Sequence, residues 1–114
     1  MIPYWTQKFV IDDQTHEVNL YNYSAKCIVL ASDQTFGKSF AKDFKNIGGK
    51  YNSKLKFSED QDPQGGWIFR ATNESQSSLT NLLKDIFNGN VKPSIFKLKE
   101  PIFDSEVIGK KILN

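Results

Sequence analysis

The 114-residue sequence contains little cysteine and histidine and no long apolar run. Its single cysteine, Cys27, excludes an internal disulfide and favours a reducing, intracellular location. The single histidine, His16, lies in a predicted turn without a second histidine or a cysteine nearby, so neither a zinc site nor a Cys–His pair is indicated. A membrane span needs about 18 apolar residues, and no apolar stretch of the sequence approaches this length. The first residues lack the basic and apolar regions of a signal peptide.

Positive charge is concentrated in one part of the chain. The net charge is only +2, but the segment from Lys26 to Phe57 carries seven lysines against two acidic residues. Arginine is nearly absent, since Arg70 is its single occurrence. The acidic group Glu59, Asp60 and Asp62 follows directly. It is typical of a solvated loop, with weak cation binding as the alternative, and the sequence predicts no metal site and no cofactor.

The length predicts one domain, which we place at residues 1–90. Aromatic and β-branched residues predict a hairpin, with turn formers between its two strands. A continuous apolar run predicts a central strand that is buried on both faces. Two further strands follow, joined by a loop at 58–66. The predicted strands are residues 4–11, 17–23, 26–31, 54–57 and 67–70, with a turn at 12–15.

Two helices are predicted from apolar spacing. Phenylalanines at 36, 40 and 44, followed by Ile47, form one stripe at the helical period. Asp33 or Thr35 would cap this helix, and Gly48-Gly49 would end it. Asn73 would cap the second helix, which Asn88-Gly89 would end. Its predicted buried side consists of Leu79, Leu82, Leu83, Ile86 and Phe87.

The fold class is therefore α+β, an antiparallel sheet of about five strands with two packed helices in the order ββ-βαββα. Residues 91–114 differ from this domain, because Pro93 and Pro101 interrupt an apolar extended segment. We expect this tail to lie in a groove on its own domain, or to contact a protein partner or a second copy of the chain.

The stretch Gly37-Lys38-Ser39 resembles part of a phosphate-binding P-loop. The first glycine of that motif is replaced by Ser32, although it is needed for the sharp turn toward the phosphates. No later apolar strand ends in an acidic residue that would hold magnesium. We therefore interpret the motif as a decoy and expect a protein that is not an enzyme.

A second pattern indicates binding to nucleic acid. Lys38, Lys42 and Lys45 fall at i, i+4 and i+7, opposite the phenylalanine stripe, and form one basic ridge. Lysines attract phosphates, and exposed aromatic residues provide stacking platforms for unpaired bases. A solvated helix face is the alternative. The candidate site residues are Lys38, Lys42, Lys45, Lys50, Tyr51, Asn52, Lys54 and Lys56.

Several of these residues also belong to a family pattern. Tyr23-Ser24 with Lys26, Gly48-Gly49-Lys50-Tyr51-Asn52 and Gly66-Trp67-Ile68-Phe69 follow Y-S-x-K, G-G-[KR]-[FYW]-N and G-W-I-F in order. Residues 23–87 thus resemble a small module of large DNA viruses, phages and mobile elements. The chain departs from the pattern at Ala25, where an acidic residue is common, and at Ser32, where glycine is usual. The resemblance implies a setting of replication, packaging or virion assembly.

Together these patterns predict non-enzymatic binding of nucleic acid, most of all single-stranded DNA, with low sequence specificity. The predicted location is inside a host cell, in the cytoplasm, the nucleus or the virion, without membrane attachment. The alternative is a small structural or interaction protein, such as a minor virion component, that contacts other chains through its tail and hairpin.

Overall fold

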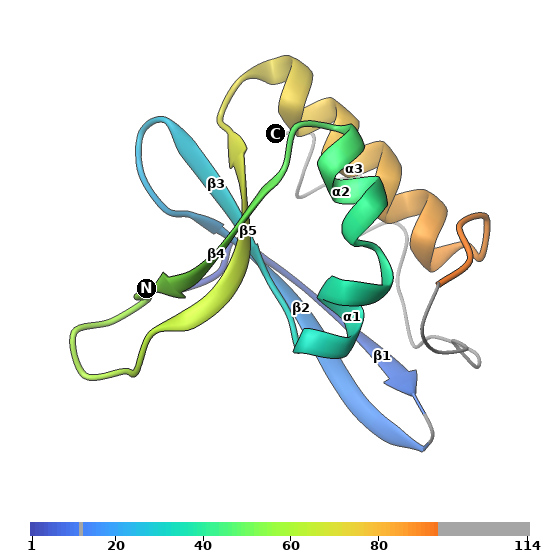
Figure 1. Cartoon of the computed structure of the whole chain (residues 1–114), viewed down its shortest axis with the longest axis horizontal. Coiled ribbons are helices and arrows are strands. Elements are labelled where there is room, and N and C mark those ends of the chain that lie inside the picture. Colours follow the sequence, from blue (N-terminus) through green and yellow to red (C-terminus); the bar gives the residue numbers. More distant parts are fainter. Residues whose placement is uncertain (12, 94–114) are drawn as a thin grey trace.

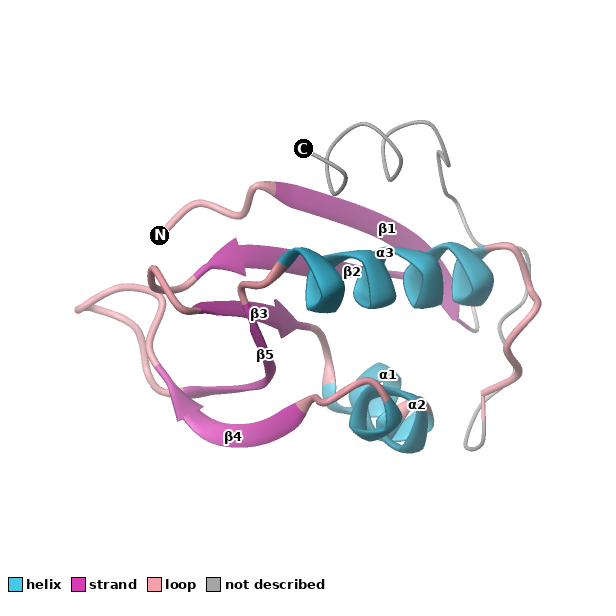
Figure 2. Cartoon of the chain, turned by 90° about the horizontal axis from the view of Figure 1, so that it is seen from above, coloured by secondary structure: helices cyan, strands magenta, loops and turns pink. Residues whose placement is uncertain are grey.

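The computed structural model describes residues 1–11 and 13–93 of the 114-residue chain. In this part of the chain five strands form one antiparallel sheet in the order β1-β2-β3-β5-β4 (Figure 1). The strands are β1 (Trp5–Ile11), β2 (Gln14–Asn22), β3 (Cys27–Ala31), β4 (Lys50–Leu55) and β5 (Gln64–Arg70). The helices are α1 (Gln34–Ser39), α2 (Ala41–Asn46) and α3 (Asn73–Phe87), and they pack against one face of the twisted sheet (Figure 2). The predicted α+β class is confirmed.

Strand β3 lies at the centre of the sheet and is buried on both faces, as its apolar run predicts. Ile28 and Leu30 point into the main core beneath the helices, whereas Val29 and Ala31 belong to a smaller apolar cluster on the opposite face. This alternation follows from the two-residue period of a strand. The main core is mostly aromatic, and its buried rings are Trp5, Phe9, Phe36, Phe40, Phe44, Trp67, Phe69 and Phe87.

The phenylalanine stripe is confirmed, because Phe36, Phe40 and Phe44 are fully buried. The single helix expected there is wrong, since the segment forms α1 and α2 with a break at Phe40 (φ −116°, ψ 16°). At this break the Ser39 hydroxyl donates a hydrogen bond to the Thr35 carbonyl at 2.7 Å. Such bonds of serine to the preceding turn bend helices.

The first hairpin is tighter than the sequence predicts. Ile11 pairs with Gln14, so β2 begins at Gln14 and the expected turn at 12–15 is too long. Asp13 has the left-handed φ of 66° that such tight turns require. His16 therefore lies in β2, opposite Phe9, and its predicted place in a turn is wrong. The start of β2 is polar and exposed, so it lacks the apolar alternation from which a strand is predicted.

The two strands of the second hairpin, β4 and β5, also begin earlier than predicted. β4 starts at Lys50, not at the predicted residue 54, and β5 starts at Gln64, not at 67. β4 is exposed along all but its last residue and pairs with β5 alone at the edge of the sheet, so it carries no apolar pattern. Gly66 lies within β5, where a Cβ would come 2.9 Å from the Leu55 side chain.

The last described helix, α3, is capped by Thr72, whose hydroxyl accepts a hydrogen bond from the Ser75 amide at 3.1 Å. The predicted cap, Asn73, is wrong by one residue, because it is already the first helical residue. Gly89 follows the helix with a φ of 79°, which confirms the predicted end. Val91 packs against the core. Of the predicted tail at 91–114, residues 94–114 lie outside the described residues.

Candidate functional site

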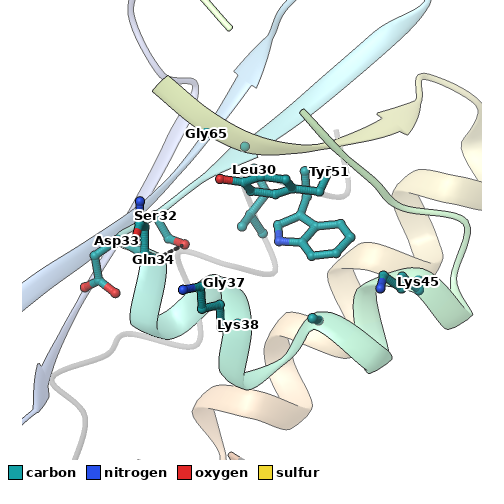
Figure 3. A pocket seen from close by; sticks show the side chains of 12 residues that line it. Leu30, Ser32, Asp33, Gln34, Gly37, Lys38, Lys45, Tyr51 and Gly65 are labelled. Carbon is teal, nitrogen blue, oxygen red and sulfur yellow. Dashed lines mark hydrogen bonds between the residues drawn. The ribbon is translucent and has the colours of Figure 1, made fainter. Parts of the chain in front are cut away.

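A pocket of about 340 Å³ opens where the end of β3 meets the two short helices and the β4–β5 edge. Figure 3 shows Tyr51 and Gly65 on its strand side and Lys38 and Lys45 on its helix side. Leu30, Ala41 and Trp67 also line the pocket and give it an apolar surface. It thus combines apolar walls with cationic groups contributed by separate elements.

Tyr51 forms the outer wall of the pocket. Its side chain is 51% exposed, and its ring meets the buried Trp67 ring edge-on, with the centroids 5.5 Å apart. The two residues are direct cross-strand partners and therefore lie on the same face of the sheet. Gly65 gives the Tyr51 ring room, because a Cβ there would lie only 2.0 Å from the phenolic oxygen. The pocket therefore presents a half-exposed aromatic ring supported from behind.

The predicted basic ridge is only partly gathered at this pocket. Lys38 of α1 and Lys45 of α2 line it, whereas Lys42 is exposed and does not. Lys50 and Asn52 alternate with Tyr51 along β4, opposite Ile68 and Gly66, and so lie on the other face of the sheet. Lys54 and Lys56 are exposed at and beyond the end of β4. Of the eight predicted site residues, the structure brings Lys38, Lys45 and Tyr51 together.

The opposite face of the sheet carries a second aromatic cluster, which is packed differently. The Tyr21 ring stacks on the buried Phe57 ring with centroids 4.4 Å apart, and Tyr23 meets Phe57 edge-on. The Tyr23 hydroxyl accepts a hydrogen bond from the Lys56 amide at 3.3 Å. Burial, with Glu17 as a smaller cause, raises the pKa of Tyr21. These rings contact one another and offer less open surface than Tyr51.

Asp33 lines the pocket and fixes the start of α1. One carboxylate oxygen accepts a hydrogen bond from the Phe36 amide at 2.8 Å, which confirms Asp33 as the predicted cap. The other oxygen lies 2.5 Å from His16 Nδ1. The His16 ring in turn stacks on Phe9, with centroids 5.6 Å apart. This chain of contacts ties the first hairpin to the wall of the pocket, a role for His16 that the sequence does not indicate.

The stretch that resembles a P-loop lies inside α1. The helix begins at Gln34, and the Gly37 amide already donates to the Asp33 carbonyl at 3.2 Å. The Ser39 hydroxyl is bonded to the Thr35 carbonyl. The Gly37 amide and the Ser39 hydroxyl therefore make hydrogen bonds within the helix and do not form a phosphate-binding loop. This agrees with the interpretation that the resemblance to a P-loop is only superficial.

The described part of the chain shows neither a metal-binding cluster nor a membrane-spanning helix. Residues 1–11 and 13–93 contain no group of three or more His, Cys, Asp or Glu side chains placed to hold a metal ion. None of the helices in these ranges is long and apolar enough to cross a membrane.

The pocket also has polar groups that the sequence does not indicate as site residues, from Ser32, Asp33, Gln34 and the indole nitrogen of Trp67. Trp67 is only 4% exposed, and its Nε1 has no hydrogen-bond partner within the described residues. Gly37 lies next to it, because a Cβ on Gly37 would be 3.4 Å from Nε1.

Comparison of the chain with protein-family models, with curated proteins and with solved structures found no match.

Proposed function

We propose that this protein binds single-stranded nucleic acid, with DNA as the first candidate, and carries out no catalysis of its own. The observation that carries the proposal is the meeting of Lys38, Lys45 and half-exposed Tyr51 around one pocket. Two ammonium groups offer attraction to phosphate, and the aromatic ring offers a face on which a base can stack. The resemblance to a viral and mobile-element module supports a setting of replication or packaging.

The same residues favour unpaired strands over duplexes. Stacking on Tyr51 requires a base whose face is free, which a duplex does not provide. Low sequence specificity follows from the type of cation, because lysine acts as a point charge, whereas guanine is read best by paired hydrogen bonds from arginine. Arg70 is exposed but lies outside the pocket.

Charge reversal tests the proposal. We expect Lys38→Glu with Lys45→Glu to abolish measurable binding of a labelled oligo-dT at 50 mM salt. The matched control is Lys26→Glu with Lys92→Glu, which makes the same change of charge at two exposed lysines outside the pocket. Both variants are compared with the wild type by fluorescence anisotropy.

Three outcomes decide between the functions. Loss of binding in the pocket variant alone supports the proposal. Equal loss in both variants would mean that net charge, not the pocket, attracts the strand, and would overturn the assigned site. If the wild type binds neither single- nor double-stranded oligonucleotides at low salt, the proposal is wrong and a structural or interaction protein becomes the better account.

A further inference from the structure

The pocket has a volume and a lining that suit a small planar group. At about 340 Å³ it lies at the lower end of the range found for small-molecule sites, about 300–1,000 Å³. Its apolar surface comes from Leu30, Ala41 and Trp67, and the Tyr51 ring forms one wall. The volume suits one planar ring system with its substituents better than two stacked ones.

A buried donor lies at the wall of this pocket. Trp67 Nε1 can only donate a hydrogen bond, and no acceptor among the described residues meets it. A buried N–H without a partner is costly, so an acceptor supplied from outside the chain would stabilise it. The Ser32 hydroxyl is also near, because a Cβ on Gly37 would lie 3.7 Å from that oxygen and 3.4 Å from Nε1.

Gly37 lies beside both of these polar groups. Its φ is not in the left-handed region, and it lies within α1, so conformational freedom does not require a glycine there. The absence of a side chain instead leaves free the position that a Cβ would occupy, 3.4 Å from Trp67 Nε1 and 3.7 Å from Ser32 Oγ. The space for a ligand atom at Trp67 Nε1 therefore depends on this glycine.

We propose that the pocket holds one unstacked nucleobase of the bound strand. The base lies against the Tyr51 ring, an acceptor on its edge receives the hydrogen bond from Trp67 Nε1, and the neighbouring phosphates lie near Lys38 and Lys45. Each natural base presents at least one ring nitrogen or carbonyl oxygen as an acceptor, so this contact needs no particular sequence. The inference rests on the proposed function and adds how the strand is held.

The indole N–H signals in a ¹H–¹⁵N spectrum test this assignment directly. The two tryptophans give two such signals, and Trp5→Phe identifies which belongs to Trp67. Trp5 Nε1 is also buried without a partner in the described residues but does not line the pocket, so it is an internal control. We expect dTMP and dAMP at millimolar concentration to shift the Trp67 signal and leave the Trp5 signal in place. Inorganic phosphate at the same concentration is expected to shift neither.

Gly37→Ala provides the matching variant. The added methyl group occupies the space beside Trp67 Nε1, while alanine favours the helix, so the variant is expected to fold. We expect its affinity for dTMP to fall about fivefold or more, with the salt dependence of oligo-dT binding unchanged. Ala41→Leu, which narrows the apolar side of the pocket, is expected to act in the same direction.

The outcomes separate this inference from the proposed function. If oligo-dT binds with the expected salt dependence but neither nucleotide shifts the Trp67 signal, the base-pocket inference is wrong and the proposed function stands. Unchanged nucleotide affinity in both Gly37→Ala and Ala41→Leu would also overturn it. If the nucleotides bind and oligo-dT does not, the pocket is a site for free nucleotides and the proposed function is wrong.

Discussion

Gly65→Ala should impair strand binding while leaving the fold nearly intact. The new Cβ would lie 2.0 Å from the phenolic oxygen of Tyr51 and 2.8 Å from its ring carbon Cζ, so the ring must move away. The contacting atoms belong to the far end of a half-exposed side chain, which can rotate toward solvent. The substitution therefore displaces the stacking platform without touching Lys38 or Lys45.

The magnitudes follow from the contacts that are lost. The edge-on contact of Tyr51 with Trp67 is the main packing at risk, and such aromatic pairs contribute about 0.5–1.5 kcal/mol. We therefore expect the free energy of unfolding to fall by no more than about 1.5 kcal/mol. Base stacking is worth about 1–3 kcal/mol, so the affinity for oligo-dT should fall between about 5-fold and 150-fold.

The assay compares three variants by anisotropy at constant salt, with denaturant melts alongside. Tyr51→Ala should lose as much affinity as Gly65→Ala, and the double variant should lose no more than either single one, because both changes remove the same ring contact. Wild-type affinity in Gly65→Ala would refute the role of Tyr51. Additive losses of affinity in the double variant would show that Gly65 affects binding by a route other than the position of the Tyr51 ring.

Four further predictions concern the fold and the rejected motif. Phe40→Ala should lower the free energy of unfolding by about 3–5 kcal/mol, because the ring is fully buried; a loss under about 1 kcal/mol in denaturant melts would contradict the core assignment. Asp33→Ala should cost about 0.5–2 kcal/mol by removing the α1 cap, whereas wild-type stability in the same melts would mean that the cap and its His16 contact contribute little. Magnesium-dependent ATPase activity should be absent from the wild type, and activity that Lys38→Ala abolishes would restore the P-loop interpretation. A chain that ends at Asn90 should still give a cooperative melt, and an unfolded product would place the tail within the core.

Much of the core could be predicted from the sequence because its signals are local. The spacing of Phe36, Phe40 and Phe44 marks a buried stripe whether the backbone is one helix or two. The break at Phe40 could not be predicted, because it coincides with a hydrogen bond from the Ser39 hydroxyl to the Thr35 carbonyl. Such a bond leaves the spacing of the apolar residues unchanged. The predicted start of β4 at residue 54 is four residues too late for a related reason, since the strand pairs with β5 at the sheet edge and all but its last residue are exposed.

The candidate site could be predicted only in part. The lysines and the tyrosine are visible in the sequence as residue types, and Lys38, Lys45 and Tyr51 meet at the pocket. The pocket itself depends on Gly37 and Gly65, which act by leaving space beside Trp67 and Tyr51. Such space depends on which strands and helices become neighbours, so it has no sequence signature.

The most direct test of the account is the affinity of the wild type for single-stranded oligo-dT at 50 and 200 mM salt. Each phosphate contact on a single strand contributes about −0.7 to the logarithmic salt slope. Contacts from Lys38 and Lys45 therefore predict at least about a sevenfold loss of affinity over this range. Equal affinity at both salt concentrations, or no binding at either, would contradict the claim that this pocket binds nucleic acid.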